Sequence, residues 1–291
     1  MSRRPARRSV ADMMEKTQTV LGGGGLRLHV EQRGEPLGPP IVFVHGWSQS
    51  QLCWERQLAG PLAREFRLVT FDLRGHGMSA RPAGGDGYGD ARLWADDLHA
   101  VLEGLALARP VLVAWSYGAF VATDFLRIYG EDRVAGLNLV GGAVHLTAGF
   151  DDIGPGLLEN AGAACGDDLG ANVAATCRFL RACTARPLDE DDLLRALGWT
   201  MAVPADVRRA LFARRLDADD VLRRLSIPVL VTHGRADAIV LPSMAKHVLA
   251  TCPTARPSWY DGVGHAPFME DAARFDRELA ELVRDCVGAA V

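Results

Sequence analysis

The sequence predicts an α/β fold in which helices cover both faces of a mostly parallel β-sheet. Short runs rich in β-branched residues alternate with stretches of helical periodicity, which is the order of elements that a parallel sheet needs. Several of these runs are apolar throughout, as expected of strands buried on both faces. One long interval, 144–225, breaks the alternation and shows only helical patterns. It predicts a helical insertion over the carboxyl edge of the sheet, where ligands bind in open α/β folds.

The predicted strands differ in how much of their surface is buried. Segment 26–34 alternates between apolar and polar residues and follows four glycines at 22–25, which favour a hairpin turn over a phosphate-binding loop. Segment 39–46, by contrast, is a continuous apolar run. The predicted strands are 26–34, 39–46, 66–72, 109–116, 134–143, 227–237 and 255–261.

Helical periodicity fills most of the intervals between these strands. A glycine-rich loop extends to about Gly89, and a helix that begins at 117 ends at Gly130, a typical helix-terminating residue. The predicted core helices are roughly 53–65, 90–107, 117–130, 242–251 and 268–286, and those of the insertion are around 156–164, 168–182, 189–199 and 204–225.

These patterns divide the chain into a core, formed by 17–143 and 226–291, and a helical cap, 144–225. The first 16 residues carry four arginines but lack the apolar stretch of a secretory or twin-arginine signal. We therefore expect residues 1–16 to form a flexible basic tail.

Composition excludes several classes of function. The chain has 291 residues, of which 48% are hydrophobic and 23% charged, so it can bury a core. Its formal net charge of -4 gives no basic field for nucleic acid, and no apolar run approaches the roughly 18 residues of a membrane span. The 6 cysteines are too sparse for a disulfide framework. We expect reduced thiols in a cytoplasmic protein, with a Cys177–Cys183 pair left open.

A serine stands where the fourth predicted strand gives way to a helix. Residues 114–118 read Ala-Trp-Ser-Tyr-Gly, close to the G-x-S-x-G pattern of a strand–turn–helix elbow. Small residues flank such a serine because the turn brings two backbones together, and Ala114 exceeds the usual glycine by only a methyl group. Ser116 is the predicted nucleophile, and the alternative is a serine that caps the helix.

A serine nucleophile needs a histidine base that a carboxylate orients. In folds with this elbow the chain order is serine, acid, histidine. Asp237 ends the sixth predicted strand, and His265 follows the seventh within the sequence DGVGH. Asp261 is the competing acid, but it lies in the same loop as the histidine.

An oxyanion would need two backbone N–H donors. The residue after the nucleophile, Tyr117, supplies one at the start of a helix. The loop His45-Gly46-Trp47 follows the second predicted strand, and we assign the second donor to the N–H of Trp47. No H-E-x-x-H motif and no G-x-G-x-x-G strand–helix unit occurs, so we expect neither a metal nor a cofactor.

Over about residues 20–287 the chain resembles the α/β-hydrolase superfamily. The resemblance rests on HGW (45–47), DLRGHGMS (72–79), AWSYG (114–118), HGRAD (233–237) and GVGHAPFMED (262–271). It implies an eight-stranded sheet with a cap inserted after the sixth strand. The segments from HGWSQSQLCWERQ to DLRGHGMS are similar to the small-esterase branch, which includes enol-lactone hydrolases and cofactor-free haloperoxidases.

The resemblance also implies structural roles for other polar residues. His45 and His76 are expected to hydrogen-bond within turns, and Asp72 and Arg74 to hold a loop together. His233 is expected inside or at the end of a strand.

The expected function is cleavage of a carboxylic ester or lactone with a small to medium, largely apolar acyl group. The alternatives are a haloperoxidase or perhydrolase on the same triad, a lyase or C–C hydrolase, and a ligand-binding sensor on a hydrolase scaffold. The expected partner is a small molecule, with neither nucleic acid nor membrane, and the protein a monomer or homodimer. The candidate pocket residues are Trp47, Tyr117, Phe150, Phe179 and Trp199.

Overall fold

The computed structural model of the chain describes residues 14–146, 151–214 and 216–288. An 8-stranded sheet runs through it in the order β1-β2-β4-β3-β5-β6-β7-β8. Strand β2 is antiparallel to its neighbours β1 and β4, and the other neighbouring strands pair in parallel. The strands are β1 (Met14–Leu21), β2 (Arg27–Gly34), β3 (Pro40–Val44), β4 (Arg67–Phe71), β5 (Val111–Trp115), β6 (Gly136–Val140), β7 (Val229–Gly234) and β8 (Ala255–Tyr260).

The structure adds β1 to the predicted strands. It pairs along its length with β2, from Met14 opposite Gly34 to Leu21 opposite Arg27, and the glycine run between them forms the predicted hairpin turn. The strand is missed because it lies at an edge of the sheet, where its polar sequence is mostly exposed. Since β1 begins at Met14, the expected tail 1–16 is too long, and what remains of it lies outside the described residues.

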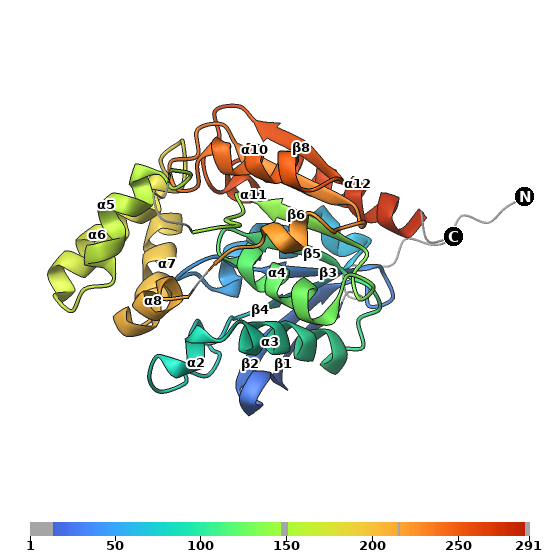
Figure 1. Cartoon of the computed structure of the whole chain (residues 1–291), viewed down its shortest axis with the longest axis horizontal. Helices are drawn as coiled ribbons and strands as arrows, with labels where there is room; N and C mark the ends of the chain where they lie inside the picture. Colours follow the sequence, from blue (N-terminus) through green and yellow to red (C-terminus); the bar gives the residue numbers. More distant parts are fainter. Residues whose placement is uncertain (1–13, 147–150, 215, 289–291) are drawn as a thin grey trace, which may run out of the picture.

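Helices cover both faces of the sheet (Figure 1). Alternate side chains of a strand enter different cores: Phe43 of β3 belongs to the cluster that contains residues of α1, α11 and α12, and Val44 belongs to the cluster that contains residues of α3, α4 and α10. The core helices are η2 (Gly23–Gly25), η3 (Gln51–Trp54), α1 (Glu55–Leu58), η4 (Pro61–Arg64), α2 (Asp86–Gly89), α3 (Ala91–Gly104), α4 (Gly118–Tyr129), α10 (Pro242–Thr251), α11 (Pro267–Glu270) and α12 (Ala272–Gly288).

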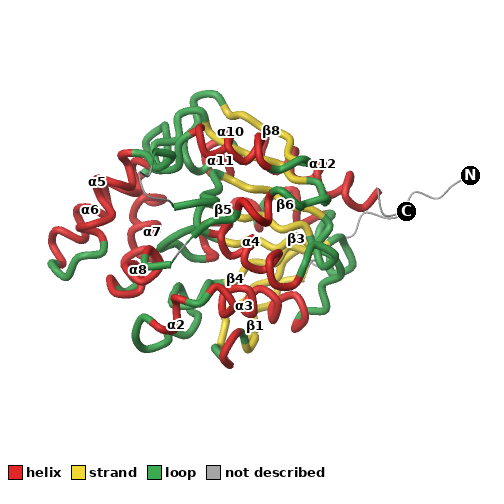
Figure 2. The backbone as a smooth tube through the Cα atoms, viewed as in Figure 1, coloured by secondary structure: helices red, strands yellow, loops and turns green. Residues whose placement is uncertain are grey.

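A helical insertion separates β6 from β7. Its helices are α5 (Pro155–Ala164), α6 (Leu169–Ala182), α7 (Glu190–Met201), α8 (Ala205–Phe212) and α9 (Asp219–Leu222). Figures 1 and 2 show α5 to α8 gathered beyond one end of the sheet. The two ends of the insertion pair with each other, because Leu146 N–H donates to Leu216 O and Ala218 N–H donates to Val144 O. This pairing interrupts the predicted helix 204–225, which is two helices, α8 and α9.

Two other predicted helices are also divided. The segment 53–65 contains three short helical turns, and 268–286 contains α11 and α12. All 6 cysteines are free thiols, so no Cys177–Cys183 disulfide forms in this part of the chain. Among the described helices, none is long and apolar enough to cross a lipid bilayer.

Candidate active site

Ser116 occupies a sharp turn between β5 and α4. Its φ of +54° lies in the left-handed region, which few residues other than glycine adopt. Hydrogen bonds fix the turn, because Ser116 N–H donates to Val140 O and Ala119 N–H donates to Ser116 O. A Cβ atom on Gly118 would lie 2.5 Å from Val44 O, so only glycine allows α4 to start this close to β3. The local sequence thus folds as the predicted elbow and leaves Ser116 partly accessible.

Asp237 lies in the loop after β7 and is buried. Its Oδ1 atom accepts hydrogen bonds from the backbone N–H groups of Ile239 at 2.8 Å and Val240 at 3.0 Å. Such bonds stabilise the ionised carboxylate and fix its orientation. The Oδ2 atom remains for a partner on another loop.

That partner is His265, in the loop after β8. Its Nδ1 atom lies 2.7 Å from Asp237 Oδ2, and because a carboxylate only accepts, Nδ1 carries the donated proton. This leaves Nε2 as the ring atom that can accept a proton. The backbone holds the ring in place, since His265 N–H donates to Cys183 O and the indole N–H of Trp115 donates to His265 O.

His233 also approaches the buried carboxylate. Its Nε2 atom lies 2.9 Å from Val240 O and 3.4 Å from Asp237 Oδ2, so Nε2 carries a proton directed at both oxygens. Burial lowers the pKa of His233, although the negative charge of Asp237 opposes this shift. The ring is therefore a neutral donor that supports the loop of Asp237.

The competing residues have other roles. Asp261 is exposed and forms an ion pair with Arg235 at 2.8 Å. His45 accepts from Leu73 N–H through Nε2 at 3.0 Å, and His76 accepts from Ser48 N–H through Nε2 at 3.2 Å. Burial lowers the pKa of both histidines, to about 4 for His76. Neutral rings that bridge turns agree with the structural roles expected for them.

Asp72 and Arg74 are structural as well. Asp72 accepts from the N–H groups of Gln51 at 2.8 Å and Met78 at 2.9 Å. Arg74 forms a two-bond ion pair with Asp97 of α3, at 2.7 and 2.8 Å. Both groups fasten the turn 72–79 to neighbouring elements.

A small cavity joins the candidate residues. Ser116 and His265 share its wall with Trp47 and Phe179, and Leu157 of α5 closes it from the insertion. Its volume is about 20 Å³, room for about one water molecule. The complete lining is Gly46, Trp47, Gln49, Trp115, Ser116, Leu157, Phe179, Ile239 and His265.

The backbone around this cavity offers the two predicted donors. Tyr117 directly precedes α4, where N–H groups have no acceptor within the helix. Trp47 stands in the loop after β3, and a Cβ atom on the adjacent Gly46 would lie 3.1 Å from Ser116 Cβ. Among the described residues no hydrogen bond uses the N–H of Trp47 or Tyr117. Both therefore remain candidates for binding an oxyanion.

The predicted pocket residues divide into three groups. Trp47 and Phe179 line the cavity and touch each other edge to face, with ring centroids 5.3 Å apart. Tyr117 and Trp199 are not among the residues that line it, and a pocket role for their side chains stays a prediction. Phe150 lies outside the described residues. The lining residues Ile239, Gln49 and Trp115 are not predicted from the sequence, because no local sequence pattern distinguishes them from ordinary packing residues.

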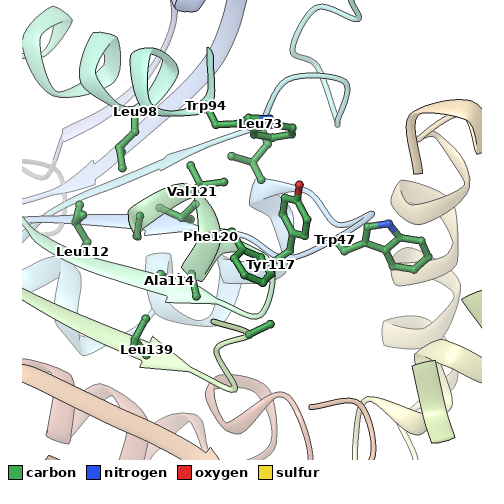
Figure 3. Packing of buried hydrophobic residues seen from close by; sticks show 14 of the residues in the cluster. Trp47, Leu73, Trp94, Leu98, Leu112, Ala114, Tyr117, Phe120, Val121 and Leu139 are labelled. Carbon is green, nitrogen blue, oxygen red and sulfur yellow. The ribbon is translucent and has the colours of Figure 1, made fainter. Parts of the chain in front are cut away.

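Contacts between the core and the insertion hold the Tyr117 and Trp199 side chains outside this lining. The hydroxyl of Tyr117 accepts from Arg214 at 3.0 Å, and its ring packs on Trp94 with centroids 5.8 Å apart. The indole of Trp199 donates to Gln49 at 2.9 Å. Figure 3 shows Trp47 extending toward the helices of the insertion while Tyr117 takes a different direction.

Comparison with known families settles the relationship that the site suggests. Residues 39–272 match the family described as the alpha/beta hydrolase fold. The chain belongs to this α/β-hydrolase family. Within the described residues, no group of three or more His, Cys, Asp and Glu side chains is arranged to hold a metal ion.

Individual relatives of this α/β-hydrolase are similar over most of its length. A crystal structure of a candidate aryl esterase from Burkholderia cenocepacia is 35% identical, with a TM-score of 0.89, over 94% of this chain and 100% of that one. The esterase structure from Rhodococcus sp. ECU1013 is 34% identical, with a TM-score of 0.87, over 92% and 98%. A pimeloyl-[acyl-carrier protein] methyl ester esterase of Vibrio atlanticus (strain LGP32) is 27% identical over 85% of this chain and 95% of its own. These relatives support an enzyme with an ester-cleaving role.

Proposed function

We propose that this chain is a serine hydrolase that cleaves a carboxylic ester or lactone through an acyl-enzyme. The observation that carries the proposal is the 2.7 Å contact between Asp237 and His265 beside a cavity whose wall also contains Ser116. A carboxylate, an imidazole and a hydroxyl in this order can activate the hydroxyl as a nucleophile.

The reaction follows from the roles of these groups. The Oγ atom of Ser116 attacks the ester carbonyl, and the Nε2 atom of His265 accepts its proton. Asp237 holds the imidazole in the required tautomer and stabilises its charged form. The N–H groups of Trp47 and Tyr117 bind the oxyanion. His265 then protonates the leaving alcohol, and a water that it activates releases the acid.

The substrate class follows from the walls around the nucleophile. Trp47, Leu157, Phe179 and Ile239 make these walls apolar, and no described lysine or arginine side chain is among them. A charged group placed there would lose its hydration without gaining a partner. We therefore propose that the acyl group is small to medium in size and largely apolar.

The direct test is hydrolysis of p-nitrophenyl acetate and butyrate by the purified protein. Ser116→Ala should lower turnover by at least about a thousandfold, because the covalent route is lost. Ser243→Ala is the matched control, since Ser243 is exposed on α10, and it should retain wild-type turnover. Equal turnover by wild type and Ser116→Ala would contradict the mechanism.

A further inference from the structure

A second cavity lies behind the wall of the first. It has a volume of about 200 Å³, ten times that of the cavity at Ser116. Among the described residues that line it, Arg214 supplies the one charged group and the others are apolar. The apolar residues are Leu146, Ile153, Leu157, Leu158, Ala161 and Phe212. We call this cavity the α5 chamber.

Two observations show that the α5 chamber adjoins the cavity at Ser116. Leu157 belongs to the walls of both cavities. Beside it, Trp47 of the active-site cavity touches Phe212 of the chamber, with ring centroids 5.1 Å apart. Because the Leu157 side chain belongs to both walls, its rotation can join the two spaces without a change of fold.

The chamber also reaches the surface. Leu158, in its outer wall, is 52% exposed, whereas Leu157 is half-buried. The space at Ser116 is too small for an acyl chain, so a substrate longer than a few atoms has to occupy further volume. The α5 chamber is the adjoining volume, and it is smaller than the roughly 300–1,000 Å³ of sites for drug-sized ligands. It therefore suits a chain better than a fused ring system.

The positive charge of Arg214 already has a partner within the protein. Its guanidinium forms a buried ion pair with Asp124, donates to the Tyr117 hydroxyl at 3.0 Å and lies 5.3 Å from the Trp94 ring centroid. A ligand carboxylate would compete with Asp124 and be repelled by it. The chamber therefore favours an uncharged chain.

We propose that the α5 chamber holds the acyl chain of the ester and that Leu157 is the gate through which the chain extends from Ser116. This proposal deepens the proposed function and rests on it. It makes α5 the element that determines acyl-chain length, with Ala161 at the position where added volume shortens the chain accepted.

The test varies the acyl chain of p-nitrophenyl esters from acetate to octanoate. In Ala161→Phe, the ratio of kcat/KM for octanoate to that for acetate should fall by about tenfold or more, because the ring fills the chamber. Leu157→Ala should raise the same ratio by opening the partition. Gly162→Phe is the matched control, because Gly162 is exposed on the same helix and no atom lies near its added Cβ. An unchanged ratio in both chamber variants would overturn the proposal.

Two further substrate series identify the occupant. Octyl acetate carries its chain on the alcohol, so its rate relative to ethyl acetate should change little in Ala161→Phe. A loss confined to octyl acetate would overturn the assignment to the acyl side. p-Nitrophenyl hydrogen suberate, whose acyl chain ends in a carboxylate, should react more slowly than the octanoate. If the protein prefers the suberate and Arg214→Gln removes this preference, the proposal that the chamber holds an uncharged chain is overturned.

A binding measurement separates this proposal from the proposed function. Methyl octanoate binding to Ser116→Ala, followed by calorimetry, requires no turnover. Adding Ala161→Phe should weaken this binding by about tenfold or more, and circular dichroism should confirm that the variant is folded. If Ala161→Phe weakens binding but the wild-type protein hydrolyses no ester, the proposed function is contradicted and the role of the α5 chamber as a binding site for the chain still stands. Binding unaffected by Ala161→Phe would overturn the chamber whatever the activity.

Discussion

At the scale of single residues, Gly141 shows how closely the backbone fits the candidate base. Its φ is +48°, and an added Cβ would lie 2.8 Å from Nδ1 of His265, the atom that contacts Asp237. Gly141→Ala should push the imidazole from its position and lower kcat/KM for p-nitrophenyl butyrate by about a hundredfold, since small misplacements of a catalytic group are costly.

Gly130→Ala is the matched control for this substitution. Gly130 also has a positive φ, +79°, but no atom lies within 4 Å of its added Cβ. An alanine there is also strained by its positive φ, but it lacks the contact to His265. Both variants should lose stability in thermal unfolding, but only Gly141→Ala should lose most of its activity. Similar activities in the two variants would contradict the positional role of Gly141.

At the scale of elements, a buried ion pair joins the turn 72–79 to α3. The side chains of Arg74 and Asp97 are 2% and 0% exposed. Asp97→Ala leaves the guanidinium buried without its carboxylate, which should lower the free energy of unfolding by about 3–5 kcal/mol. Glu15→Ala breaks the exposed Arg33–Glu15 pair and should cost less than about 1 kcal/mol. Urea denaturation compares the two, and equal losses would show that burial does not decide the effect.

A buried carboxyl group on helix α12 predicts that the free energy of unfolding depends on pH. Asp276 is buried beside Gln57, which donates to it at 3.1 Å, and burial raises its pKa from 3.8 to about 6. The folded state therefore binds this proton more tightly than the unfolded state. The ionised Asp276 carboxylate destabilises the folded state. This destabilisation is absent below pH 3.8, grows as the pH rises and is complete above about 6.

Asp276→Asn removes this titration. At pH 7.5 it should raise the free energy of unfolding by about 1–3 kcal/mol, and at pH 4 the gain should nearly vanish. Thermal unfolding at the two pH values measures the difference. Asp285→Asn, on the exposed face of the same helix, should have little effect at either pH. A gain that is equal at pH 4 and pH 7.5 would disprove the titration of Asp276.

At the scale of the whole molecule, the sequence predicts which candidate catalytic residues follow the strands better than it predicts which side chains line the cavity. Ser116 and Asp237 each come after a strand whose apolar run is evident, and His265 follows the edge strand β8, so the parallel sheet places all three at one end of its strands. Strand β1 has no such run, because it packs at an edge, and the sequence pattern does not reveal it.

Side-chain direction depends on residues far along the chain. The Tyr117 ring turns away from the cavity toward Arg214, 97 residues later. Trp47 is fixed by its indole N–H, which donates to the carbonyl of Arg208 at 3.0 Å. Periodicity reports which face of a helix is apolar but not which part of the core that face meets. The insertion could therefore be predicted as helical, but its contacts with the core could not.

The central claim is that Ser116 is an activated nucleophile, and reaction with a small fluorophosphonate tests it most directly. One covalent adduct should form on the wild-type protein, and mass spectrometry should locate it on the peptide that contains Ser116. Ser116→Ala should form none, and Ser243→Ala should react like wild type. An adduct at another residue, or none on a wild-type protein that hydrolyses p-nitrophenyl esters, would show that Ser116 is not the activated nucleophile.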